Sequence, residues 1–242
     1  MLIQEGWVKN QKVRLHYLDS NPDDPGILLP IIFIPGALAS AEVYITEIIA
    51  LQPRRCIALS LRGRGKSDAP ESGYSFDHHV SDIMALMKEI GLKRFCLMAY
   101  SMGVPFAIGY AIHNPNPLSG LILGDYPARY PAFPPEWVEK ELLKYPHRIK
   151  KEVVCAIQRE SEEVSLWDSL KFIQCPALIL RGGKPGSLLR VEAVEMYRQY
   201  ISNAKTVVFQ DSGHELWEPD FDRFIFTIKE FLEEIDSRTK QE

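Results

Sequence analysis

Hydrophobic and polar positions follow two different patterns along the chain. Residues 3–9 and 12–19 are two short runs in which apolar and polar side chains alternate, separated by Asn10 and Gln11, and this predicts an antiparallel hairpin. From Pro30 onward, short runs rich in Ile, Leu and Val alternate with longer amphipathic segments, which predicts an α/β fold with a mostly parallel sheet and helices on both faces. The predicted strands are 31–34, 56–61, 95–100, 118–124, 177–181 and 206–210, and the clearest predicted helices are 76–90, 102–113, 190–201 and 220–235.

One segment interrupts this alternation. Residues 126–135 (YPARYPAFPP) are dense in proline and aromatic side chains, charged helix-like sequence follows, and no strand pattern is evident between Asp125 and Cys175. Long loops without structure are uncommon unless they are functional. We therefore expect residues 126–168 to form a small helical cap, inserted into a core made of residues 1–125 and 169–242. A long surface crossover is the alternative.

Composition narrows the class of ligand. The chain has 242 residues, is 46% hydrophobic and 25% charged, and carries a formal net charge of −4 without a long basic run, so we expect no nucleic-acid partner. The longest apolar stretch, residues 27–41, is broken by Pro30, Pro35 and Gly36, so we expect no membrane span. Residues 1–9 lack a signal-peptide pattern, which makes the cytoplasm the default location. The expected partner is a small-molecule substrate, and no oligomeric state follows from these patterns.

The four cysteines give no sign of a metal site or a disulfide framework. Cys56, Cys96, Cys155 and Cys175 are far apart in sequence and form no C-x-x-C pair. Such cysteines are typical of buried, reduced thiols. We expect neither a metal nor a cofactor.

Ser101 stands where a predicted strand turns sharply into a predicted helix. This strand, turn and helix arrangement is that of a nucleophile elbow, in which the residues two before and two after the nucleophile must be small. Ala99 and Gly103 meet that requirement. The helix N-terminus offers unpaired N–H groups and the positive end of a dipole to a developing oxyanion. Ser101 is therefore the candidate nucleophile, and a simple helix N-cap is the alternative.

Around this elbow the chain resembles the α/β-hydrolase fold superfamily, in its serine esterase and lactonase branch, over nearly its whole length. Ser101 matches the nucleophile of that family, with Ala99 in place of the first glycine of G-x-S-x-G. Three further segments carry the resemblance: residues 34–37 (IPGA) match the His-Gly turn with Pro35 in place of His, residues 61–68 (LRGRGKSD) match the D-x-R-G-x-G-x-S loop with Ser60 in place of Asp, and residues 213–219 (GHELWEP) match the late histidine loop.

His214 is the candidate general base. It lies in a glycine-containing loop just after an apolar predicted strand and before a predicted helix, so it belongs at the carboxyl edge of the sheet, where ligands bind. The other five histidines fall in the hairpin, in helical segments or in the cap. A structural loop histidine is the alternative.

The acid departs from the family pattern. The resemblance implies an Asp after the strand at 177–181, but residues 182–187 read GGKPGS and contain no carboxylate. Some members of the family carry the acid one strand earlier, where Asp125 stands. The helix after Ser101 descends by about 18 Å and the next strand climbs back by about 20 Å, which brings Asp125 to the level of Ser101. Asp125 would orient His214. The alternatives are a cap-entry residue paired with Arg129, and Asp211 as a reserve acid.

The resemblance also implies an oxyanion hole made by two backbone N–H groups. These belong to Met102, directly after the nucleophile, and to Ala37, after the turn formed by Pro35 and Gly36. Backbone donors of this kind stabilise the charge that develops on a carbonyl oxygen. No particular side chain is required at either position.

Two further groups of residues have competing interpretations. A basic loop suggests either an anion site or a structural turn, and the absence of P-loop spacing favours the turn. The aromatic residues of the cap either line an apolar acyl pocket or pack the cap itself. The basic residues are Arg62, Arg64 and Lys66, and the aromatic residues are Tyr126, Tyr130, Phe133 and Trp137.

Together these residues predict a hydrolase of small carboxylic esters or lactones that acts through a Ser101–His214–Asp125 triad and a covalent acyl-enzyme. By resemblance, epoxide hydrolases and haloalkane dehalogenases use Asp at the elbow, so a serine there argues against their chemistry. Thioesterase or lyase chemistry on the same triad is one alternative. A non-catalytic ligand-binding or signalling member of the fold is another.

Overall fold

The computed structural model describes residues 3–23, 26–145 and 148–239 and contains one large mixed sheet. Its eight strands lie in the order β1-β2-β4-β3-β5-β6-β9-β10. β1 and β2 form an antiparallel hairpin, β2 is antiparallel to β4, and all the following neighbours are parallel. The bounds are β1 Gln4–Asn10, β2 Val13–Asp19, β3 Ile31–Ile34, β4 Cys56–Leu59, β5 Phe95–Tyr100, β6 Leu118–Gly124, β9 Ala177–Gly182 and β10 Ala204–Phe209.

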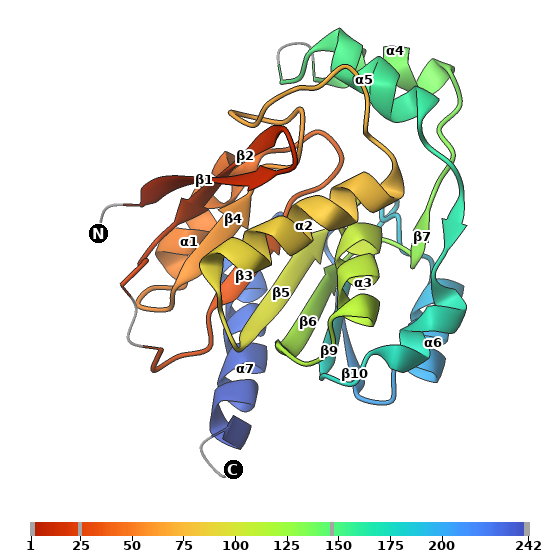
Figure 1. The fold of residues 1–242 in the computed structure, drawn as a ribbon. Helices are drawn as coiled ribbons and strands as arrows, with labels where there is room; N and C mark the ends of the chain where they lie inside the picture. The colour runs from red at the N-terminus through yellow and green to blue at the C-terminus, as the bar shows by residue number, and fades with distance from the viewer. Residues whose placement is uncertain (1–2, 24–25, 146–147, 240–242) are drawn as a thin grey trace.

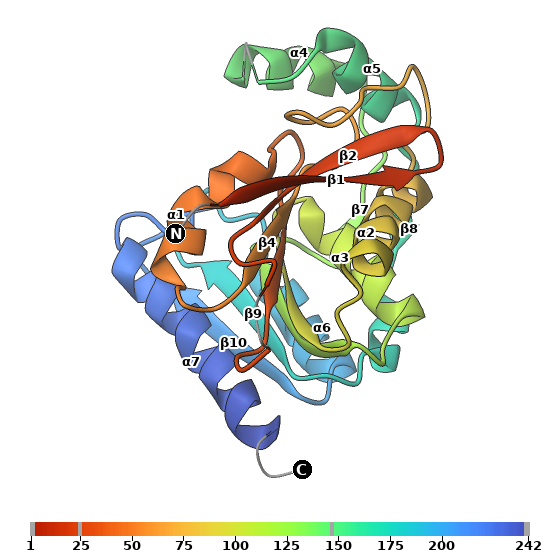
Figure 2. The same cartoon turned by 60° about the vertical axis from the view of Figure 1, so that its left-hand side comes forward.

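The central strands are apolar along their whole length because both faces of the sheet are covered. Successive residues point to opposite faces, so Ile31 and Phe33 pack into one core cluster and Ile32 and Ile34 into the other. Figure 2 shows α1 and α7 on one side of the sheet and α2, α3 and α6 on the other. The helices are η1 Ala41–Tyr44, α1 Ile45–Ala50, α2 Phe76–Ile90, α3 Gly103–His113, η2 Trp167–Phe172, α6 Val191–Tyr200 and α7 Phe221–Thr239.

The predicted elements are confirmed, with small differences at their ends. The strand predicted at 56–61 ends at Leu59, because its neighbour β3 ends at Ile34 and the next residue, Pro35, has no N–H to continue the ladder. Helices η1 and α1 were not among the predicted elements. They fill the connection between β3 and β4.

Residues 126–168 contain more regular structure than expected. Two helices, α4 (Glu136–Lys144) and α5 (Lys151–Arg159), lie beyond one end of the sheet (Figure 1). The expectation of no strand in this segment is wrong, because β7 (Arg129–Tyr130) pairs antiparallel with β8 (Val164–Ser165). Strands of two residues are too short to show an alternating pattern in sequence. The division into core and cap at 125 and 168 remains a prediction.

The helical segment packs against the core through a small apolar cluster of its own. Val153 and Val154 of α5 are buried together with Leu38 and Tyr74, which belong to the core, and Ala37 packs against the same cluster. The loop that follows β3 therefore lies directly beneath the helices. Within the described parts of the chain, no helix is long and apolar enough to cross a membrane.

Candidate functional site

Ser101 occupies a strained turn between β5 and α3. Its φ is +53°, in the left-handed region that non-glycine residues rarely adopt, and its N–H donates to the Gly124 carbonyl at 2.8 Å. A Cβ at Gly103 would lie 2.6 Å from the Pro35 carbonyl oxygen, so only glycine fits there. The sequence requirement for small residues around the elbow thus has a specific cause, which is the close approach of the loop after β3. Strain of this kind gathers at functional sites.

Asp125 lies beside Ser101 at the carboxyl edge of the sheet. The register of the parallel pair places Tyr100 opposite Gly124, so the next residues on the two strands are Ser101 and Asp125. Asp125 is completely buried and also has a positive φ, +48°. A buried carboxylate must have hydrogen-bond donors or an opposite charge nearby.

Four donors surround the Asp125 carboxylate. Oδ1 accepts from the Gly182 N–H at 3.1 Å and from the Ser187 hydroxyl at 2.6 Å. Oδ2 accepts from the Leu188 N–H at 2.9 Å and from His214 Nδ1 at 2.8 Å. Three of the four donors come from the end of β9 and the loop after it, the segment that lacks the acid implied by resemblance. This segment holds the carboxylate of the neighbouring strand instead.

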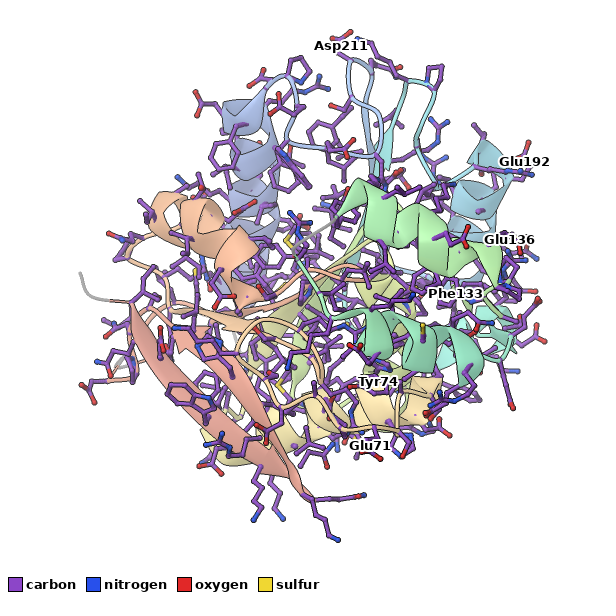
Figure 3. The ribbon with its side chains drawn as sticks, turned by 90° about the horizontal axis from the view of Figure 1, so that it is seen from above. Glu71, Tyr74, Phe133, Glu136, Glu192 and Asp211 are labelled. Carbon is purple, nitrogen blue, oxygen red and sulfur yellow. The ribbon has the colours of Figure 1, made fainter. Side chains whose placement is uncertain are left out.

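His214 connects Asp125 to Ser101. Because a carboxylate only accepts, Nδ1 carries the proton in its bond to Asp125, and Nε2 is free to accept from the Ser101 hydroxyl, 2.9 Å away. Tyr100 supports this histidine, since its ring stacks on the imidazole at 4.8 Å and its hydroxyl donates to the His214 carbonyl at 2.8 Å. Asp211, the reserve acid, is exposed and lies at the periphery when the molecule is seen from above (Figure 3).

The predicted oxyanion donors lie on either side of the nucleophile. A Cβ at Gly36 would be 3.1 Å from the Ser101 Cβ, so the loop that carries Ala37 touches the elbow. Neither the Ala37 nor the Met102 N–H donates to an acceptor within residues 3–23, 26–145 and 148–239. Both N–H groups therefore remain available for a carbonyl oxygen bound at Ser101. The Ala37 carbonyl accepts from Arg64 Nε at 3.0 Å.

Three of the four aromatic residues predicted for the cap are in contact, since Tyr130 meets Phe133 edge-on at 5.8 Å and Phe133 stacks on Trp137. Tyr130 is completely buried, and Tyr126 packs at the edge of the main core. Phe133 and Trp137 stack on each other at 4.1 Å and pack on the cluster that contains Leu38. Phe133 and Trp137 therefore lie over the loop after β3, near Ala37. Figure 3 shows Phe133 between helices α4 and α5.

Two of the three basic residues in the loop after β4 form ion pairs, and the third does not. Arg62 makes a buried, bidentate ion pair with Asp82, and Lys66 pairs with Glu5 at the surface. Arg64 is also buried but makes no ion pair with any described residue. Ser187 and Tyr100 have no predicted part in the site, and Arg64 was considered for an anion site, with a structural turn as the favoured interpretation. The loop of Ser187 lacks the acid that the resemblance implies, and this was the one indication that its residues contact an acid from another strand. The contacts of Tyr100 and Arg64 join segments far apart in the sequence, so no local sequence pattern predicts them.

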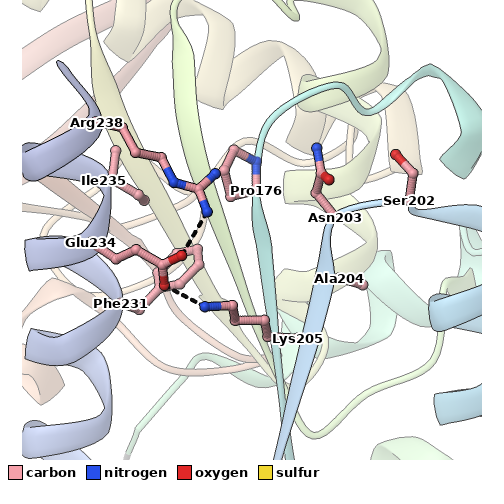
Figure 4. Close-up of a pocket in the computed structure, with 9 residues that line it drawn as sticks. All are labelled: Pro176, Ser202, Asn203, Ala204, Lys205, Phe231, Glu234, Ile235 and Arg238. Carbon is pink, nitrogen blue, oxygen red and sulfur yellow. Dashed lines mark hydrogen bonds and ion pairs between the residues drawn. The ribbon is translucent and has the colours of Figure 1, made fainter. Parts of the chain in front are cut away.

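A separate hollow of about 240 Å³ lies at the amino ends of β9 and β10 (Figure 4). Glu234, in its wall, accepts hydrogen bonds from Lys205 and Arg238, so its charge is neutralised within the hollow. The opposite edge of the sheet carries Ser101 and Asp125. No group of three or more His, Cys, Asp or Glu side chains in the described parts of the chain is arranged to hold a metal ion.

Comparisons with known proteins agree with this architecture. A family model described as the alpha/beta hydrolase fold matches residues 30–153. N-formylmaleamate deformylase from Pseudomonas putida is 25% identical over 94% of this chain and 96% of its own length. The esterase RhEst1 from Rhodococcus sp. ECU1013 has a TM-score of 0.80 at 20% identity, covering 97% of this chain and 100% of its own. Est816, described as an N-acyl homoserine lactone degrading enzyme, has a TM-score of 0.75 at 19% identity, covering 93% of this chain and 100% of its own.

The match of the family model covers about half of the chain and includes the elbow at Ser101, and the structural likeness covers nearly all of it. The predicted fold class is thereby confirmed. The chain belongs to the α/β-hydrolase fold family.

Proposed function

We propose that the protein hydrolyses small carboxylic esters or lactones through a covalent acyl-enzyme on Ser101. The observation that carries this proposal is the continuous hydrogen-bonded chain from Asp125 through His214 to Ser101, with links of 2.8 and 2.9 Å. Such a chain activates a hydroxyl that is otherwise a poor nucleophile at neutral pH.

In the first half of the reaction, Ser101 Oγ attacks the carbonyl carbon of the ester while His214 Nε2 takes the hydroxyl proton. The negative charge that forms on the carbonyl oxygen is stabilised by the Ala37 and Met102 N–H groups. Asp125 stabilises the imidazolium. The C–O bond to the alcohol then breaks, His214 returns its proton to the departing oxygen, and the acyl group remains on Ser101.

The second half repeats these steps with water as the nucleophile. His214 Nε2 removes a proton from water, the hydroxide attacks the acyl carbon, and the oxyanion forms again at Ala37 and Met102. When the bond to Ser101 breaks, His214 returns the proton to Ser101 Oγ. The products are the carboxylic acid and the alcohol, or the hydroxy acid when the substrate is a lactone. No external reductant, oxidant or cofactor enters the balance.

The names of similar proteins support acyl-group hydrolysis as the reaction class. The full-length relative in Pseudomonas putida is a deformylase, and the two structural neighbours are an esterase and a lactone-degrading enzyme. A deformylase and an esterase cleave a bond to an acyl carbon, and a lactone is a cyclic ester. A serine nucleophile in this chain suits all three.

Labelling by a fluorophosphonate probe and turnover of p-nitrophenyl acetate test this proposal together. The wild-type protein should be labelled and should release p-nitrophenol with an initial burst, and Ser101→Ala should abolish both while keeping the thermal unfolding transition. If folded wild-type protein is neither labelled nor active, Ser101 is not a nucleophile. A ligand-binding or signalling protein that keeps the fold would give this negative result.

A further inference from the structure

Arg64 is a buried cation with unused hydrogen-bond donors. It is 1% exposed. Its Nε donates to the Ala37 carbonyl at 3.0 Å and its Nη1 to the Arg62 carbonyl at 2.7 Å. Nη1 also donates to His79 Nε2 at 2.8 Å, because the Nδ1 proton of His79 is used by the Ser75 carbonyl. The two N–H groups of Nη2 are buried and have no partner among the described residues.

The charge of Arg64 is not balanced by a neighbour. The nearby carboxylate of Asp82 is bound in a bidentate fashion by Arg62, and no described carboxylate lies within ion-pair distance of Arg64. Burial lowers the pKa of the Arg64 guanidinium to about 10, so it still carries its charge at neutral pH. An unpaired charge in a protein interior is costly, and proteins keep one where it has a use.

Two tyrosine hydroxyls beside Arg64 are also buried without a partner, those of Tyr74 and Tyr130. The Tyr74 ring lies 6.3 Å from the ring of His79. The Tyr130 ring lies 5.3 Å from Phe106, which stacks on His79 at 4.5 Å. Burial raises the pKa of both tyrosines to about 12 against the opposing effect of the Arg64 charge, so both hydroxyls are protonated and able to donate.

We propose that Arg64 Nη2 and the hydroxyls of Tyr74 and Tyr130 form an anion subsite, and that the substrate carries a carboxylate in addition to its scissile ester. This inference rests on the proposed function and names the substrate class. An apolar acyl chain would leave all of these donors unsatisfied. A water molecule would accept their hydrogen bonds without balancing the charge, whereas a carboxylate does both.

The position of these residues fits a substrate that also reaches Ser101. Arg64 donates a hydrogen bond to the Ala37 carbonyl, and the N–H of the same residue, Ala37, is a proposed oxyanion donor. Tyr74 lies in the loop before α2, and Tyr130 lies on β7 beneath the helical segment. The three residues therefore lie where residues 126–168 pack on the rest of the chain, and such boundaries between packed segments are a common location for ligand sites.

Paired esters test the subsite. The monomethyl esters of malonate, succinate and glutarate carry a carboxylate, and methyl acetoacetate, methyl levulinate and methyl 5-oxohexanoate replace it with a neutral acetyl group of similar size. In a pH-stat assay, the wild-type protein should show at least about tenfold higher kcat/KM for the anionic ester of at least one pair, because hydrogen bonds to a charged group are worth about one to two powers of ten.

Tyr74→Phe and Tyr130→Phe remove single hydroxyls and keep the rings, so both variants should fold; loss of an unpartnered buried hydroxyl is neutral or stabilising. Each should lower the ratio of kcat/KM for the anionic over the neutral ester by about tenfold. Arg64→Met should lower it further. Tyr110→Phe, which removes a hydroxyl near the far end of α3, should leave the ratio unchanged.

The outcomes separate this inference from the proposed function. If Ser101 is labelled and neutral esters are hydrolysed, but no anionic ester is preferred or the ratio is the same in both tyrosine variants, the subsite is overturned and the triad stands. If nothing is labelled or hydrolysed, the proposed function fails. Succinate then tests the subsite alone: it should raise the Tm of the wild-type protein more than that of Tyr130→Phe, and equal or absent shifts overturn the proposal.

Discussion

Asp125→Asn changes one atom of the candidate triad and keeps its shape. The Asp125 carboxylate accepts two donors on each oxygen, and the amide of Asn replaces one oxygen with a donor. The less costly orientation turns the amide nitrogen toward Gly182 and Ser187. The Ser187 hydroxyl can rotate away, since the Leu189 carbonyl lies 3.3 Å from it, but the Gly182 N–H is then buried without an acceptor.

Two magnitudes follow from this geometry. An orphaned buried donor costs about 1–3 kcal/mol, which we expect as the loss in free energy of unfolding. The rate falls for a different reason, because the imidazolium of His214 loses a negative charge. A pair of charges about 4 Å apart, at an effective dielectric constant of about 20, is worth about 4 kcal/mol, or about 10³-fold in kcat. If the amide turns the other way, His214 takes the wrong tautomer and the loss approaches 10⁴-fold.

Steady-state turnover of p-nitrophenyl acetate and urea unfolding measure the two effects on the same preparations. Asp211→Asn is the matched control, because it makes the same change at an exposed aspartate three residues before His214. It should leave both quantities within experimental error. The reasoning is refuted if Asp125→Asn keeps kcat within about tenfold of the wild type, or if Asp211→Asn loses as much as Asp125→Asn.

Three further changes probe the surroundings of the triad. Ser187→Ala removes the 2.6 Å hydrogen bond to the buried Asp125 carboxylate and should lower the free energy of unfolding by about 1.5–3 kcal/mol and kcat for p-nitrophenyl acetate by about tenfold; unchanged values of both would contradict this. Gly103→Ala would place a Cβ 2.6 Å from the Pro35 carbonyl oxygen. It should lower the free energy of unfolding in urea by about 1–3 kcal/mol and slow fluorophosphonate labelling of Ser101. Wild-type values for both would show that the elbow tolerates a side chain at this position. Burial holds the pKa of His79 well below its ordinary value of 6.5, so the unfolded chain binds a proton that the native protein excludes, and stability falls as the pH drops below 6.5. In His79→Gln the slope of unfolding free energy between pH 5 and 6.5 should be smaller by up to about 1.4 kcal/mol per pH unit, and an identical slope would show that His79 is not the source.

The sheet could be predicted from sequence because its strands are buried on both faces. Continuous runs such as the one that forms β5 leave few alternatives, and the helices between them have a clear apolar side. Predictions failed where elements are short. Helix α1 has six residues and β7 has two, and neither length is enough to establish a period.

The parts of the candidate site that lie at the ends of strands could be predicted from the sequence. Ser101 and Asp125 follow adjacent parallel strands, so counting residues along the intervening helix and strand was enough to place them at one level. What surrounds them was not predictable, because it depends on contacts between distant segments. The stacking of Tyr100 on His214 and the hydrogen bond from Arg64 to the Ala37 carbonyl join residues 114 and 27 positions apart.

The position of the acid and the glycines of the loop after β9 are parts of one arrangement. A Cβ at Gly182 would lie 1.9 Å from the Gly213 carbonyl oxygen, so the end of β9 approaches the histidine loop too closely for any side chain. That close approach brings the Gly182 N–H to the carboxylate that arrives from β6. A side chain on this strand end would push the two loops apart and remove the N–H donor. Because the end of β9 supplies a hydrogen-bond donor here, the negative charge must come from the neighbouring strand, β6. Asp125, at the end of β6, accepts hydrogen bonds from both the Gly182 N–H and His214.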